Sequence, residues 1–149
     1  MRVAVDTNIL AYVEGVNGKD RQQLAGDLVS RLPEDTRVLP AQVLGELYNV
    51  LVKKLRWSGD QARAAVAAWR NAFILAPTTL AAMNAAIDLA ADHRLSIWDS
   101  VMLSVAAESG CRLLLSEDLQ DGFVWRGVTV ANPFARVRHR LLDALLSPE

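Results

Sequence analysis

The sequence has little cysteine and no long hydrophobic run. Its single cysteine, Cys111, lies in an apolar stretch and can form no disulfide within the chain, as is typical of a reducing compartment. We interpret Cys111 as a buried structural residue, because only Arg112 beside it would favour a reactive thiolate. No stretch reaches the ~18 apolar residues that a membrane helix needs. Asp6 and Asn8 interrupt the N-terminal apolar run, so it does not read as a signal peptide. These absences predict a cytoplasmic protein with no membrane partner.

Positive charge is not in excess either. The chain has 16 Lys+Arg against 17 Asp+Glu, for a net charge of -1. Because dedicated nucleic-acid-binding domains are usually basic, any contact with RNA or DNA requires a local basic patch or metal ions. The length of 149 residues and the hydrophobic content of 52% are those of one folded domain. With no repeat and no low-complexity linker, the sequence predicts a single domain over residues 1–149.

Short apolar runs alternate with amphipathic segments along the chain. The apolar runs predict strands at residues 2–5, 36–39, 73–76, 112–115 and 128–130. The helical patterns cover residues 8–13, 19–31, 41–55, 61–71, 79–93, 99–108 and 135–146. This alternation predicts an α/β fold of three layers, in which a short central parallel sheet lies between helices.

Helical spacing also predicts which side chains face the core. The spacing of Leu24, Leu28 and Leu32 indicates one buried face, and the helix over 79–93 is expected to turn Leu80, Met83 and Ile87 inward. Aromatic side chains bury large apolar areas, so the tryptophans are expected in the core or an interface rather than stacked on bases. They are Trp57, Trp69, Trp98 and Trp125.

Carboxylates follow two of the predicted strands. Asp6 ends the first strand, and the segment Ser116-Glu117-Asp118 ends the fourth. In open α/β sheets, ligands bind beyond the carboxyl ends of the strands. Glu46 lies on the helix after the second strand, and Asp99 lies at the start of a later helix. If the loops converge, four carboxylates share one pocket, where their mutual repulsion favours a hard cation such as Mg²⁺.

Each acid also has a purely structural interpretation. Asp6 and Asp99 are suited to capping a helix. Glu46 fits a solvated helix face, and Asp118 and Asp121 suit a turn that contains the nearby Gly122. No single position decides between the two interpretations, so the argument depends on the whole ordered set.

That ordered set resembles a known family. Val-Ala-Val-Asp6-Thr7-Asn8-Ile-Leu, a mid-chain helix with Glu46, Trp98-Asp99-Ser100 and Leu-Leu-Leu-Ser116-Glu117-Asp118-Leu-Gln-Asp-Gly are similar to the motifs of PIN domains. More narrowly, they resemble the VapC-type toxins of bacterial type II toxin–antitoxin pairs. The resemblance runs from Arg2 to about Phe134. It implies an endoribonuclease that hydrolyses RNA phosphodiester bonds with Mg²⁺, for which Mn²⁺ can substitute.

The resemblance also implies site residues and partners. It makes Asp6, Glu46, Asp99 and Asp118 the catalytic acids and metal ligands, with Asp121 as a further candidate ligand. Polar side chains that would orient the acids are Thr7, Asn8 and Ser116. The implied partners are the RNA substrate, a cognate antitoxin protein and a second copy of the chain in a homodimer.

Two basic clusters have open roles. The first, Lys53, Lys54 and Arg56, suits contact with RNA phosphates but equally complements the dipole at a helix C-terminus. The second is Arg136, Arg138, His139 and Arg140, for which a solvated face is the default interpretation and an RNA or partner contact the alternative.

Two other functions compete with the nuclease. One is a non-catalytic regulatory or RNA-binding domain of the same fold, with an acidic pocket that binds metal without cleavage. The intact set of four acids disfavours this alternative. The other is a protein that is phosphorylated on Asp6, which would require a lysine on a later loop, and no lysine follows Lys54.

Overall fold

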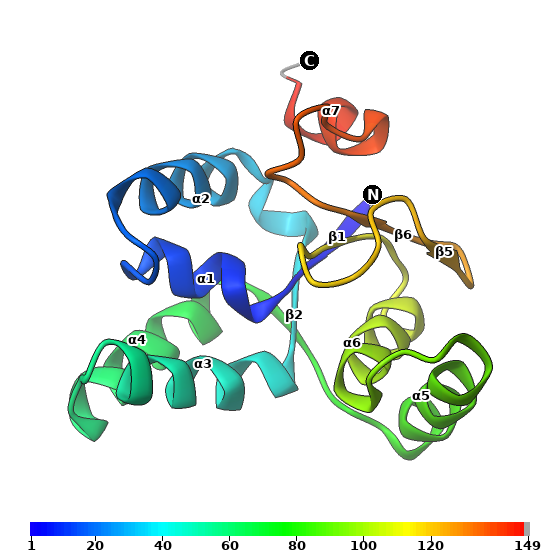
Figure 1. The fold of residues 1–149 in the computed structure, drawn as a ribbon, viewed down its shortest axis with the longest axis horizontal. Helices are drawn as coiled ribbons and strands as arrows, with labels where there is room; N and C mark the ends of the chain where they lie inside the picture. Colours follow the sequence, from blue (N-terminus) through cyan, green and yellow to red (C-terminus); the bar gives the residue numbers. More distant parts are fainter. Residues whose placement is uncertain (148–149) are drawn as a thin grey trace.

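The computed structural model describes residues 1–147 and shows a six-stranded sheet flanked by helices (Figure 1). The strands are β1 (Arg2–Val5), β2 (Arg37–Pro40), β3 (Ile74–Ala76), β4 (Cys111–Leu115), β5 (Val124–Trp125) and β6 (Val128–Ala131). The helices are α1 (Thr7–Val13), α2 (Lys19–Arg31), the 3₁₀ turn η1 (Glu34–Thr36), α3 (Ala41–Lys54), α4 (Gly59–Ala72), α5 (Leu80–His93), α6 (Ile97–Glu108) and α7 (Arg140–Leu146). The predicted α/β fold with a short parallel sheet is confirmed.

The strand order is β3-β2-β1-β4-β6-β5, and every pairing is parallel except the one between β5 and β6. β1 lies inside the sheet between β2 and β4. The pairing continues past the strand ends, because the amide of Asp6 donates to the carbonyl of Leu115 at 3.0 Å. The amide of Ser116 likewise donates to the carbonyl of Ala131 at 3.1 Å. Asp6 and Ser116 therefore lie side by side at the carboxyl edge of the sheet.

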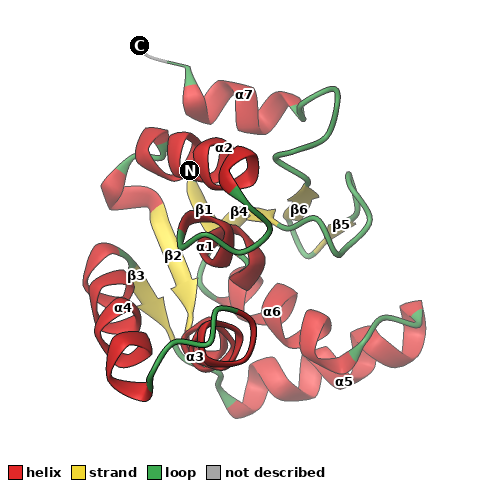
Figure 2. Ribbon diagram, turned by 60° about the vertical axis from the view of Figure 1, so that its left-hand side comes forward, coloured by secondary structure: helices red, strands yellow, loops and turns green. Residues whose placement is uncertain are grey.

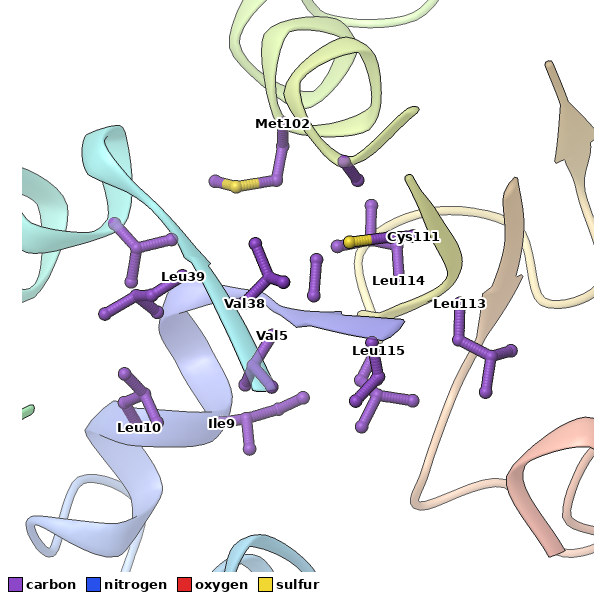
Figure 3. Packing of buried hydrophobic residues seen from close by; sticks show 14 of the residues in the cluster. Val5, Ile9, Leu10, Val38, Leu39, Met102, Cys111, Leu113, Leu114 and Leu115 are labelled. Atoms are coloured by element: carbon purple, nitrogen blue, oxygen red, sulfur yellow. The ribbon is translucent and has the colours of Figure 1, made fainter. Parts of the chain in front are cut away.

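The central strands are covered on both faces, which explains their largely apolar sequences. Figure 3 shows Met102 of α6 on one side of the strands, and Ile9 and Leu10 of α1 on the other. In Figures 1 and 2, α5 and α6 lie together on the far side of the strands from α2. Cys111 is buried in this core, and burial raises the pKa of its thiol to about 11. The structural interpretation of Cys111 is thus supported.

The predicted elements are present, but α6 and α7 begin at other residues than predicted, and the structure has one further strand. α6 begins at Ile97 instead of Asp99, because Ser96 is the N-cap and its hydroxyl accepts a hydrogen bond from the Asp99 amide at 3.1 Å. α7 begins at Arg140 instead of residue 135, because the ring Nδ1 of His139 caps it by accepting from the Leu141 amide. β5 was not predicted, since two residues give no periodicity to detect. Across residues 1–147, no helix has both the length and the apolarity to cross a bilayer.

Two predictions of buried helix faces were wrong in part, although Met83 packs partly buried against the core as predicted. The side chain of Leu80 is 77% exposed, and Ile87 and Leu24 are exposed as well. α5 instead turns Ala82, Ala86 and Leu89 inward against α6. In an alanine-rich helix, small residues let a neighbouring helix approach closely, and the position of the largest side chains then does not mark the packed face. Leu28 and Leu32 are buried as predicted.

Candidate active site

Asp6 is buried at the junction between β1 and α1. It is the N-cap of α1, and its Oδ1 accepts a hydrogen bond from the Thr7 amide at 2.7 Å. Its Oδ2 accepts a second bond from the hydroxyl of Ser116 at 2.8 Å. Burial raises the pKa of Asp6 to about 6; the bonds from Ser116 and Thr7 oppose the rise, and the charges of Asp118 and Glu46 add to it. Asp6 is therefore both a helix cap and a carboxylate held close to other acids.

Asp118 is held beside Asp6 by two polar side chains. Ser116, directly after β4, accepts a hydrogen bond from the Asp118 amide at 3.2 Å. The Oδ2 of Asp118 accepts a hydrogen bond from the side-chain amide of Asn8 at 2.9 Å. The pKa of Asp118 is raised, first by partial burial and then by the charges of Asp99, Glu117 and Glu46, whereas Lys54 lowers it. The acids of three separate elements thus act on one another.

Glu46 and Asp99 face this group from α3 and α6. The hydroxyl of Thr7 donates to Oε2 of Glu46 at 2.8 Å. One helical turn earlier, the side-chain amide of Gln42 donates to Oε1 of Glu46 and, at 3.3 Å, to the backbone carbonyl of Trp98. Gln42 therefore ties α3 to the first turn of α6, which carries Asp99. The four residues Gln42, Glu46, Trp98 and Asp99 line a cavity of about 510 Å³.

The donor set suits a hard cation held with water. Within residues 1–147, no three Asp, Glu, His or Cys side chains lie close enough to enclose a metal ion. The carboxylates of Asp6, Glu46 and Asp118 are instead each paired with a hydroxyl or amide donor, and neighbouring acids raise the pKa of Asp6 and of Asp118, as uncompensated charges do. Mg²⁺ commonly takes only one or two carboxylates and keeps several waters, so it needs no closed protein cage. The residues present fit Mg²⁺ in this hydrated form.

Asp121 has a different environment. Its Oδ1 accepts a hydrogen bond from the Asn132 amide at 2.8 Å, which fastens the loop after β4 to the end of β6. Its charge is not among those that shift the pKa of Asp6 or Asp118. The structure supports the turn interpretation of Asp121, and its role as a metal ligand stays a prediction.

Sequence reasoning missed the residues that anchor the loop bearing Asp118. Glu117 accepts hydrogen bonds from the hydroxyl of Tyr12 and, at 3.1 Å, from the guanidinium of Arg21. The Arg21 guanidinium also lies 4.7 Å from the centre of the Phe134 ring, in cation–π contact. These contacts join α1, α2 and the C-terminal segment around the loop. No local pattern marks Tyr12, Arg21 and Glu117, since Glu117 is distant from the other two in sequence. Gln42, by contrast, lies four residues before Glu46, and this spacing is that of a side-chain pair on one helix face.

The residues of the two basic clusters have different surroundings. Lys53 and Lys54 are exposed in the last turn of α3, and the charge of Lys54 reaches Asp118. Arg138 forms an ion pair with Asp143 at 2.9 Å.

Trp57, Trp69 and Trp125 pack partly buried against the core. Trp98 is 59% exposed and so does not lie in the core, and an interface position for it stays a prediction.

Comparisons with known proteins agree with this geometry. The sequence profile of the PIN domain matches residues 3–121, a span that includes all five predicted acids. No curated protein sequence matches the chain. Among solved structures, the fold is similar to VapC20 of Mycobacterium tuberculosis, described as a toxin that cleaves the sarcin–ricin loop, with a TM-score of 0.63 and 22% identity over 75% of this chain and 86% of that one.

Two further structures cover more of the chain. A toxin–antitoxin complex from Klebsiella pneumoniae aligns with a TM-score of 0.66 and 19% identity, over 89% of this chain and 98% of that one. FitAB bound to a DNA fragment aligns with a TM-score of 0.71 and 14% identity, over 93% of this chain and 99% of that one. At identities this low, the structural similarity shows a shared fold and nothing more.

Proposed function

This chain belongs to the PIN domain family, and we propose that it is an Mg²⁺-dependent endoribonuclease that serves as the toxin of a type II toxin–antitoxin pair. One observation carries the proposal: four acids from separate segments lie close together. The charges of Asp118 and Glu46 raise the pKa of Asp6, those of Asp99 and Glu46 raise the pKa of Asp118, and Glu46 and Asp99 line one cavity. The similar solved structures include a toxin and a toxin–antitoxin complex, which supports the same assignment.

In this proposal the four acids hold Mg²⁺, or Mn²⁺ in its place. The bound cation supplies Lewis acidity, which lowers the pKa of its water and offsets the charge on the phosphodiester oxygens. The protein orients three of these acids through hydrogen bonds. Ser116 and the Thr7 amide hold the two oxygens of Asp6, Asn8 holds Asp118, and Thr7 and Gln42 hold Glu46.

No histidine serves as a general base in this scheme. His93 ends α5 and packs its ring edge-on against Phe123, with 5.4 Å between ring centres. His139 caps α7. The exposed Lys54 faces the acidic group and is suited to neutralise a substrate phosphate.

The test compares the wild-type chain with Asp6→Asn, each purified free of any partner, on single-stranded RNA with Mg²⁺ or Mn²⁺. We expect the wild type to cut the RNA, EDTA to stop it, and Asp6→Asn to lose the activity by at least about a hundredfold. Asp88→Asn, at an exposed position on α5, is the matched control and should cut like the wild type. Equal cutting by wild type and Asp6→Asn would refute the active-site assignment.

The alternative is a regulatory domain of the same fold that binds metal or RNA without cleavage. Titration calorimetry with Mg²⁺ separates the two proposals. If the wild type binds Mg²⁺, Asp6→Asn does not, and neither cuts RNA, then the regulatory function is the correct one.

The proposed partners are a cognate antitoxin and a second copy of this chain. An antitoxin should be encoded beside the gene, co-purify with the chain and block cleavage. The homodimer is checked by the mass of the purified chain in light scattering. Co-purification and particle mass are measured separately, and neither needs the cleavage assay.

A further inference from the structure

Trp98 stands apart from the other three tryptophans. The ring nitrogen of Trp69 donates to Glu14 at 2.8 Å, the Arg126 guanidinium lies over the Trp125 ring at 4.6 Å, and Trp57 packs against the core. The Trp98 side chain is 59% exposed, and in residues 1–147 no aromatic ring or guanidinium stacks on it. Leaving an indole in water forgoes one of the largest apolar burials a side chain offers.

The exposed indole lies at the candidate active site. Trp98 directly precedes Asp99 in the first turn of α6, and it lines the cavity of about 510 Å³ with Gln42, Glu46 and Asp99. That volume is within the range of small-molecule sites in proteins. Two of the proposed metal-binding acids therefore share a cavity with an unstacked aromatic ring.

The backbone beneath the ring is fixed. Gln42 donates to the Trp98 carbonyl at 3.3 Å and to the Glu46 carboxylate. The Ser96 cap holds the start of the same helix through the Asp99 amide at 3.1 Å. A ring on a fixed backbone loses little conformational freedom when a flat ligand covers it.

We propose that Trp98 is a stacking platform for one unpaired base of the RNA, next to the nucleotide whose phosphate reaches the acids. This inference rests on the proposed nuclease function and adds a base contact beside the acids. A base in a duplex is already stacked and cannot cover the ring, so this contact favours unpaired segments. The pairing of aromatic ring and base is tolerant of sequence, since every base has a flat face.

The first test measures cleavage kinetics of full-length variants on a short single-stranded RNA. Trp98→Leu keeps apolar bulk without the aromatic face, and Trp98→Phe keeps a smaller face. We expect Trp98→Leu to raise KM about tenfold with kcat within about twofold, and Trp98→Phe to recover most of the loss. Trp125→Leu, the same change on edge strand β5, should match the wild type. A Trp98→Leu variant with unchanged KM would overturn the proposal.

The second test does not need cleavage. Tryptophan fluorescence is followed while a five-nucleotide RNA is added in the presence of Ca²⁺. We expect quenching in the wild type, weaker quenching in Trp98→Phe, and none with an equimolar blunt RNA duplex. Equal quenching in wild type and Trp98→Phe, or by duplex and single strand alike, would overturn the proposal even if Trp98→Leu fails to fold.

The two tests separate this proposal from its premise. If the wild type cuts no RNA but Trp98-dependent quenching persists, then the base platform stands and the nuclease function fails. If the wild type cuts RNA and Trp98→Leu cuts it with the same KM, then the nuclease function stands and the base platform fails. If Trp98→Leu changes the mass of the particle in light scattering and leaves RNA binding unchanged, Trp98 belongs to an interface between copies, which contradicts the platform.

Discussion

The hydroxyl of Ser116 donates a 2.8 Å hydrogen bond to Oδ2 of Asp6, and this bond joins the carboxyl ends of β4 and β1. It is buried on both sides, since Ser116 is inaccessible and Asp6 is nearly so. A hydroxyl donor favours the ionised form of a carboxyl group, whereas burial disfavours it. The balance leaves the pKa of Asp6 raised to about 6, so this acid is close to its titration point near neutral pH.

The raised pKa of Asp6 predicts that metal-free protein loses stability as pH rises. The folded state holds the proton up to about pH 6, and the unfolded chain releases it near 3.8. Stability from this group is therefore complete below 3.8 and lost as pH rises through 6, by up to about 3 kcal/mol. The Asp6→Asn side chain cannot titrate. In EDTA, the unfolding free energy of this variant relative to the wild type should therefore rise by that amount from pH 4 to pH 8. Urea unfolding at both values measures the change.

The matched control for this prediction is Asp88→Asn, at an exposed position on α5. Its difference from the wild type should be the same at both pH values. If the difference for Asp6→Asn is also constant from pH 4 to pH 8, the pKa of Asp6 is not raised by burial.

Two buried serines should respond differently to alanine. Ser116→Ala removes a donor from the Asp6 carboxylate and should cost about 1–3 kcal/mol of unfolding free energy at pH 8. It should also move the acid limb of the cleavage pH profile upward, because the ionised form loses its hydrogen bond. Ser104→Ala is the control, since the Ser104 hydroxyl is buried with no hydrogen-bond partner in the described structure. Its cost should be near zero, and a similar cost for both serines would contradict the argument.

Glu117 is predicted to position Asp118. Glu117→Gln weakens the contacts to Tyr12 and Arg21, so the loop over residues 116–121 should exchange its amide hydrogens faster. Cleavage should fall about tenfold through the displaced Asp118, with Mg²⁺ affinity lowered in parallel. The control is Arg63→Gln, which breaks an exposed pair with Asp60 and should change neither readout. Faster exchange with unchanged cleavage would show that the anchor is structural alone.

Cys111 should resist thiol reagents in the folded protein. Its thiol is buried in β4, and burial raises its pKa to about 11, so little thiolate exists at pH 8. Labelling by a coloured disulfide reagent should be slow in buffer and complete within minutes in 6 M guanidinium. Rapid labelling of the native protein, at a rate independent of its unfolding rate, would place Cys111 in an accessible pocket.

α5 gives a test of the corrected helix face. Leu89→Ala removes a fully buried side chain and should cost about 2–5 kcal/mol of unfolding free energy. Leu80→Ala, on the exposed side of the same helix, should change it by less than about 0.5 kcal/mol. Urea unfolding compares the two. Equal losses of unfolding free energy would support the buried helix face that hydrophobic periodicity predicted.

The parts of the site that follow strands were predictable from the sequence. Asp6 and Ser116 come directly after apolar runs, and parallel strands place their carboxyl ends at one edge. The convergence of Glu46 and Asp99 on that edge was not a local property, because it depends on how α3 and α6 lie over the sheet. The resemblance of the ordered motifs to the PIN domain predicted that Glu46 and Asp99 join the site, whereas residue spacing alone did not.

The failures have physical causes. Hydrophobic periodicity marks the larger apolar residues, but α5 packs through alanines, so Leu80 and Ile87 were assigned to the wrong side. The contacts of Glu117 with Tyr12 and Arg21 join residues about a hundred positions apart, which no local pattern encodes. Trp98 was expected in the core or an interface because aromatic side chains bury large apolar areas, and no local pattern indicates its exposure beside Asp99.

The link between Asp6 and Ser116 spans 110 positions of the chain. The ribosome adds Asp6, Glu46 and Asp99 to the chain before it reaches β4, and a domain generally folds as one unit. The acids therefore exist as separate residues for most of synthesis and become one group only when β4 enters the sheet beside β1. A chain whose translation stops short of that strand carries three of the four acids and no assembled site.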